Sequence, residues 1–68
     1  MKKNGYHFAK NYFIGSRELI ILEWFCLGFS IFIVVDSYED FKTVHMGSLK
    51  GCIGYCEKEL VEYQQSLY

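Results

Sequence analysis

The run from Leu19 to Val35 constrains this chain more than any other feature. It reads LIILEWFCLGFSIFIVV, and Glu23 is its only charged residue. As a helix, these residues would extend about 25 Å, against a hydrocarbon layer of about 30 Å. Extension to residues 16–37 gives about 33 Å, which is enough to cross that layer. The run therefore predicts a transmembrane helix over residues 16–37.

The free energy of insertion supports this prediction. The run contains twelve Leu, Ile, Phe or Val residues, and each favours the membrane centre by about 0.3–0.6 kcal/mol. A carboxylate at the centre would cost about 3 kcal/mol, but Glu23 lies only one turn inside. Arg17 can extend its charge toward water, and Trp24 suits the interface. An ionisable group inside a span is a functional candidate, so we expect Glu23 to meet a cation on a neighbouring helix or a lipid headgroup.

A second interpretation of the same run stays open. The segment Ser30–Asp36, SIFIVVD, has the composition of a buried parallel strand that ends in an acidic loop, and periodicity alone does not assign short apolar runs. A parallel sheet needs several βαβ units, however, and a chain of 68 residues supplies about one. We therefore favour the membrane helix over a soluble α/β or helical fragment.

Charge is distributed unevenly along the chain. Residues 1–18 carry a net charge of +3, residues 19–35 carry −1 and residues 36–68 carry −3. Lys and Arg favour the cytoplasmic or matrix side of a membrane, so we expect the basic, aromatic arm of residues 1–15 to stay there and the acidic tail to cross. The overall charge of −1 argues against a nucleic-acid partner. No catalytic or phosphate-binding motif indicates an enzyme, a cofactor or a small-molecule substrate.

The tail, residues 38–67, predicts an amphipathic helix and hence an all-α fold class. Ser37 and Asp40 form a variant of the capping box. Residues that are apolar or partly so recur with a mean step of 3.6, the period of a straight helix. They are Tyr38, Phe41, His45, Leu49, Cys52, Cys56, Leu60, Tyr63 and Leu67.

Three glycines interrupt this tail, and two interpretations of them stay open. Gly47, Gly51 and Gly54 each cost a helix about 1 kcal/mol relative to alanine, which favours a break near residues 47–54. On a continuous helix they would instead lie together opposite the apolar stripe, as a smooth groove for another backbone.

The tail also holds one combination of potential metal ligands. His45, Cys52 and Cys56 share one side of a continuous helix, but positions 45 and 56 would lie about 16 Å apart along the axis. One ion does not reach all three at bonds of about 2.0–2.3 Å, so we expect no metal. Whether Cys52 and Cys56 are free thiols or bridged stays open.

In size and layout the chain resembles the small single-pass accessory subunits of mitochondrial respiratory-chain complexes and ATP synthase. The residues that carry the resemblance are the arm Lys2–Arg17, the run Leu19–Val35 and the tail Ser37–Tyr68. It implies a non-catalytic subunit of the mitochondrial inner membrane, with its N-terminus in the matrix and its C-terminus in the intermembrane space. Its expected partners are membrane lipids and the other membrane subunits of a large complex, which it would brace.

Two alternatives accompany this functional prediction. One is a free-standing small membrane regulator or self-associating single-pass peptide, and the other is a soluble helical binding module. For the favoured prediction, a set of residues is expected to contact partners or lipid. They are Arg17, Glu23, Trp24, Phe41, Gly47, Leu49, Gly51, Leu60, Tyr63 and Leu67.

Overall fold

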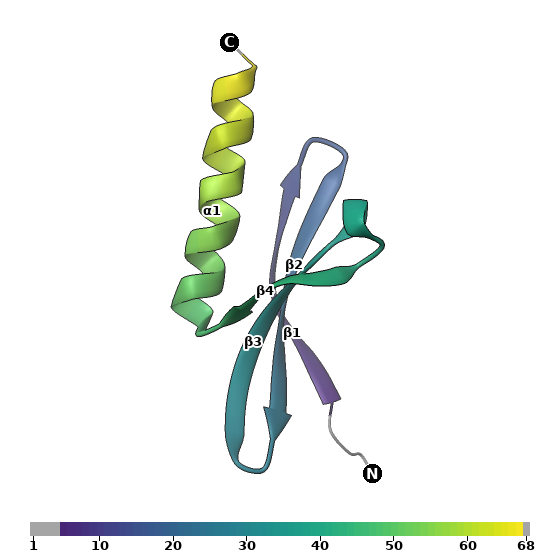
Figure 1. The fold of residues 1–68 in the computed structure, drawn as a ribbon, viewed down its shortest axis with the longest axis vertical. Coiled ribbons are helices and arrows are strands. Elements are labelled where there is room, and N and C mark those ends of the chain that lie inside the picture. Colours follow the sequence, from purple (N-terminus) through teal and green to yellow (C-terminus); the bar gives the residue numbers. More distant parts are fainter. Residues whose placement is uncertain (1–4, 68) are drawn as a thin grey trace.

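A four-stranded antiparallel sheet followed by one helix makes up the fold (Figure 1). The computed structural model describes residues 5–67. The strands follow the chain in the order β1-β2-β3-β4, and each pairs with the next. The elements are β1 (Gly5–Ile14), β2 (Arg17–Cys26), β3 (Phe29–Asp36), the short 3-10 turn η1 (Ser37–Glu39), β4 (Lys42–Gly47) and α1 (Leu49–Ser66).

The predicted transmembrane helix over residues 16–37 is wrong, because those residues form the hairpin of β2 and β3. Leu27 and Gly28 have φ angles of 54° and 80°, and two consecutive positive φ values are typical of a tight hairpin turn. The turn divides the apolar run into two strands rich in the β-branched and aromatic residues that suit a sheet. Within residues 5–67, no helix has the length and apolar character needed to cross a membrane.

The strand that the alternative interpretation placed at Ser30–Asp36 is confirmed within β3, but its pairing is antiparallel on both sides. Antiparallel neighbours need only short connections. The chain is therefore long enough for this antiparallel sheet, although it is too short for several βαβ units.

The predicted helix over residues 38–67 is correct only from Leu49 onward, and the all-α fold class is wrong. The capping box at Ser37 and Asp40 does not start a helix that continues, because Asp40 adopts a left-handed conformation and ends η1. Ser48 is the true N-cap, and its Oγ accepts a hydrogen bond from the Gly51 backbone N–H at 3.1 Å. The helix then runs unbroken to Ser66.

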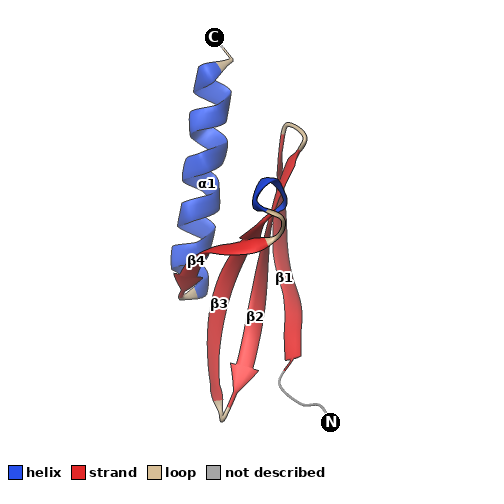
Figure 2. Cartoon of the chain, turned by 45° about the vertical axis from the view of Figure 1, so that its right-hand side comes forward, coloured by secondary structure: helices blue, strands red, loops and turns tan. Residues whose placement is uncertain are grey.

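The hydrophobic core lies between α1 and one face of the sheet (Figure 2). Leu19, Ile21 and Val34 from the sheet are fully buried against Cys52 and Cys56 of the helix. The predicted helical stripe therefore faces the core at Cys52, Cys56 and Leu60, whereas Tyr63 and Leu67 further along it are exposed. The residues before it, Tyr38, Phe41 and His45, belong to η1, the following turn and β4.

The sheet is longer than the part that the helix covers. The β1–β2 turn lies near the C-terminal end of α1, whereas the β2–β3 turn projects past its N-terminal end (Figure 1). Residues 5–14 of the predicted basic arm form β1, an edge strand with a bulge between Phe8 and Lys10. The sheet thus presents one face and one end that α1 does not cover.

Candidate functional site

The face of the sheet turned away from α1 carries the first candidate site. In a strand, alternate side chains point to opposite faces, and the strand register places cross-strand partners such as Phe8 and Leu22 on the same face. We call this surface the open face. Its exposed or half-buried apolar residues are Tyr6, Phe8, Phe13, Ile20, Leu22, Trp24, Ile31 and Met46, and the register places the buried Ile33 and Val35 among them.

The open face is apolar and rich in aromatic rings. Tyr6 and Trp24 stack with ring centroids 6.3 Å apart, and Phe8 is 64% exposed. Within residues 5–67, Glu18 has the only charged side chain on this side of the sheet, and it accepts a hydrogen bond from Asn11 Nδ2 at 2.9 Å. Exposed apolar surface of this extent commonly marks an interaction site.

The β2–β3 turn carries a second exposed apolar cluster, which we call the tip. It consists of Phe25, Leu27 and Phe29, which are 51%, 89% and 77% exposed. Phe25 pairs with Ser30 on the helix side of the sheet, whereas Phe29 lies on the opposite side. Leu27 occupies the apex of the turn with a positive φ.

An ion cluster joins the hairpin to the helix. The guanidinium of Arg17 donates hydrogen bonds to the Asp36 carboxylate, the shortest from Nη2 at 2.7 Å, and its Nη1 donates to Glu59 at 3.1 Å. The hydrogen bonds from Arg17 lower the pKa of Asp36, although burial opposes them. The same bonds raise the pKa of Arg17. The cluster is therefore charged in the folded protein and holds β2, β3 and α1 together.

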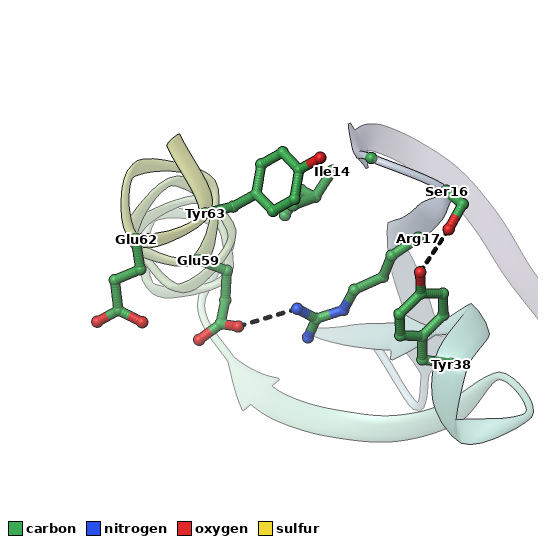
Figure 3. Close-up of a pocket in the computed structure, with 8 residues that line it drawn as sticks. Ile14, Ser16, Arg17, Tyr38, Glu59, Glu62 and Tyr63 are labelled. Carbon is green, nitrogen blue, oxygen red and sulfur yellow. Dashed lines mark hydrogen bonds and ion pairs between the residues drawn. The ribbon is translucent and has the colours of Figure 1, made fainter. Parts of the chain in front are cut away.

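A recess of about 360 Å³ lies beside this cluster, between the β1–β2 turn and the C-terminal half of α1 (Figure 3). Figure 3 shows that Arg17 points toward Glu59 and that the hydroxyl groups of Ser16 and Tyr38 meet in a hydrogen bond. Arg17 already has two carboxylate partners, and the recess has no histidine or cysteine in its lining. The ion cluster at this recess acts as a structural junction between the hairpin and α1.

Glu23 lies on the helix side of the sheet, near the end that α1 leaves uncovered. It accepts a hydrogen bond from Ser30 Oγ at 2.5 Å and lines a shallow recess with His7 and Phe25. The predicted cationic partner of Glu23 stays a prediction. Trp24, the next residue, points to the open face.

The other residues predicted to contact partners are separated by the fold. Arg17 and Tyr63 meet at the recess, Leu60 packs against the core, and Leu67 is exposed at the C-terminal end of α1. Gly47 ends β4, Leu49 and Gly51 lie in the first turn of α1, and Phe41 is exposed in the turn before β4.

Sequence reasoning missed the open face and the tip. Phe8, Leu22 and Leu27 were treated as parts of an arm and a span. The signal that points to them is the Leu27-Gly28 pair at the middle of the apolar run, with apolar residues on both sides. Glycine at that place is compatible with a two-residue turn.

The potential metal ligands of the tail do not converge. Cys52 and Cys56 are buried free thiols one helical turn apart, and the His45 ring stacks on Tyr55 at 5.0 Å. No group of three potential ligands occurs within the described part of the chain. Burial, together with the neighbouring Cys52, raises the pKa of Cys56 to about 11. Both residues act as small apolar core groups.

No known protein family, curated protein or solved structure matches this chain. The expected role as an accessory subunit of a membrane complex therefore stays a prediction, and the helix over residues 16–37 from which it was derived is replaced by a hairpin. The geometry of the open face and the tip is what supports a function.

Proposed function

We propose that this protein is a non-enzymatic self-association module and that two copies pack through their open faces. The observation that carries the proposal is the apolar sheet face turned away from α1, on which Tyr6, Phe8, Phe13 and Met46 are each more than half exposed. Sheets bury apolar faces against a second layer. Here α1 supplies that layer on one side, and a second copy supplies it on the other.

The dimensions of the face suit a dimer. Strands of six to ten residues are about 20–33 Å long at about 3.3 Å per residue, and four strands spaced about 4.8 Å apart are about 19 Å wide. The footprint is thus about 500–600 Å² per copy. Specific interfaces start at about 1,000 Å² in total, so two open faces together reach the lower end of that range.

The chemistry of the face favours a second copy as the occupant. A two-fold dimer places the same patch against itself, and an apolar patch meets no charge repulsion when it does so. Glu18, the one acidic group on this side, lies toward the β1–β2 turn and is already hydrogen-bonded to Asn11. Two sheets packed in this way form a sandwich core about 10 Å thick, with interdigitating side chains.

Single-stranded nucleic acid is the competing occupant, since bases stack on exposed aromatic rings of open sheets. Such sites also need basic groups that follow the phosphates. The open face offers Glu18 instead of a cation among the described residues. The charge of the face therefore favours the dimer.

The test is the mass of the full chain in solution across a concentration series, measured by sedimentation equilibrium. We expect reversible growth from 8.0 kDa toward twice that mass. Leu22→Lys places a charge at the centre of the open face and should shift the chain to monomer. Gln65→Lys adds the same charge on the exposed surface of α1 and should leave the dimer intact.

Three results would overturn the proposal. One is a monomer at every concentration, and another is a dimer that Leu22→Lys leaves unchanged. The third is a monomer whose Trp24 fluorescence is quenched by an oligothymidylate, which would assign the open face to nucleic acid. Circular dichroism of Leu22→Lys is recorded in parallel, so that loss of the dimer is separated from loss of the fold.

A further inference from the structure

A second exposed apolar surface of this protein, the tip, lies outside the open face and at one end of the molecule. Leu27 is 89% exposed, more than any other large apolar residue of the described chain. Its position in a two-residue turn has a φ of 54°, a conformation that Asn, Asp and Gly adopt more easily. Leucine does not favour this turn conformation, and here its side chain is not buried in the core. Its presence at the apex therefore indicates a function.

The three apolar side chains of the tip project in different directions. Phe25 projects from the helix side of the sheet, Phe29 from the other side, and Leu27 from the apex. A protein groove or a second sheet would cover one side of such a hairpin. A lipid phase surrounds an inserted hairpin on every side, so the arrangement of these three residues matches a lipid surface.

The positions of the charged residues limit how deeply the tip can enter a lipid layer. The sequence from Trp24 to Val35 contains no charged residue, and Glu23 is the nearest charged group on β2 before the turn. Leu27 is four positions after Glu23, which corresponds to about 13 Å along the strand. Apolar groups of interfacial proteins enter the headgroup and acyl boundary by about 5–10 Å, so the tip reaches this depth while Glu23 stays in water.

We propose that the tip inserts into the interfacial layer of a phospholipid membrane and anchors the protein there peripherally. In the sequence, Lys2 and Lys3 lie three and two residues before Gly5, and Gly5 pairs with Phe25 next to the tip. Basic residues close to an inserting apolar group add attraction to anionic headgroups. Membrane lipid is thus the partner, and the contact is through a hairpin that does not span the bilayer.

The experiment uses the full chain with vesicles of phosphatidylcholine, alone or mixed with phosphatidylglycerol. Trp24 is the only tryptophan and lies three residues from Leu27, so its fluorescence reports insertion. We expect co-sedimentation with vesicles, stronger when phosphatidylglycerol is present. We also expect quenching of Trp24 by brominated phospholipid, which packing of two open faces does not cause.

Leu27→Asn is the decisive variant, because asparagine suits the turn and removes the apolar apex. It should keep the thermal midpoint at or above that of the original chain and lower the vesicle partition coefficient by about tenfold. Leu67→Asn makes the same replacement at an exposed position at the far end of α1 (Figure 1) and should change neither quantity.

The proposal is overturned if the original chain stays in the supernatant with both kinds of vesicle, or if Leu27→Asn binds as well as the original chain. Binding that salt abolishes, without quenching of Trp24 by brominated phospholipid, would show electrostatic attachment without insertion and would also overturn it. The dimer is tested without lipid and through Leu22, so either proposal can fail while the other holds.

Discussion

The guanidinium of Arg17, at the start of β2, holds the buried carboxylate of Asp36, at the end of β3. Its Nε and Nη2 atoms donate to Asp36 Oδ2 at 3.0 and 2.7 Å. Asp36 is only 3% exposed, and its Oδ1 also accepts the backbone N–H of Tyr38. Because Arg17 reaches Glu59 as well, a single side chain ties the hairpin to the helix.

Replacing Arg17 by methionine should destabilise the protein strongly. The variant keeps much of the side-chain volume but leaves the Asp36 carboxylate buried without its cation, which costs about 3–5 kcal/mol. Urea unfolding followed by circular dichroism measures the change in the free energy of unfolding. Glu59→Gln is the matched control and should cost about 1 kcal/mol or less, since the Arg17–Glu59 pair is partly exposed. A larger loss for Glu59→Gln than for Arg17→Met would contradict this account.

Acid should destabilise the fold through Asp36. Hydrogen bonds from Arg17 keep the pKa of this carboxyl below its ordinary value of 3.8, so in acid the unfolded chain binds a proton before the folded chain does. The resulting stability is complete above the unfolded pKa and is lost as the pH falls through the folded pKa. Urea midpoints measured from about pH 5 to pH 2 should therefore decrease. Asp36→Asn should start from a lower midpoint and show a shallower decrease; an equal slope would assign the acid effect to other groups.

The thiols of Cys52 and Cys56 should resist modification in the folded protein. Both are fully buried, and the pKa of Cys56 is raised to about 11 by burial and by its neighbour Cys52, so little reactive thiolate is accessible. In a Cys26→Ser background, a thiol-specific disulfide reagent should label the native chain slowly and should label two thiols rapidly in urea. Rapid labelling of both thiols without denaturant would place them outside the core.

Two glycines should respond to alanine in opposite directions. A Cβ at Gly54 meets no atom within 4 Å, so Gly54→Ala should stabilise the exposed face of α1 by about 1 kcal/mol. Gly15 has a φ of +66°, and a Cβ there would lie 2.8 Å from Tyr63 Oη, so Gly15→Ala should destabilise. Thermal unfolding of both variants gives the two signs, and a loss of stability in Gly54→Ala would show that the helix is constrained there.

Local signals predicted part of the fold. The 3.6-residue period correctly identified the core-facing residues Cys52, Cys56 and Leu60 of α1, because a helix forms its backbone hydrogen bonds within one segment. The composition of Ser30–Asp36 correctly indicated a strand. The candidate site was not predicted, since Leu22 and Phe8 become neighbours only through strand pairing.

The error over residues 16–37 has a specific cause. β2 is apolar on both sides, because Leu19 and Ile21 face α1 while Ile20 and Leu22 form part of the open face. The alternation of apolar and polar residues that identifies a half-buried strand is therefore missing. A strand that is apolar on both faces and a membrane helix have similar composition, and the local signs of the difference were the turn at Leu27 and Gly28 and the composition of Ser30–Asp36.

The sequence alone established a short chain rich in apolar residues, and it placed an amphipathic helix near the C-terminus. Tertiary contacts determine that the apolar run folds into two strands. These contacts are the hydrogen bonds to β1 and β4 and the packing of α1 over one face. Such contacts join residues far apart in the chain, and no short segment contains them. For the same reason, only the folded sheet shows which apolar side chains are left for a partner and which form the core.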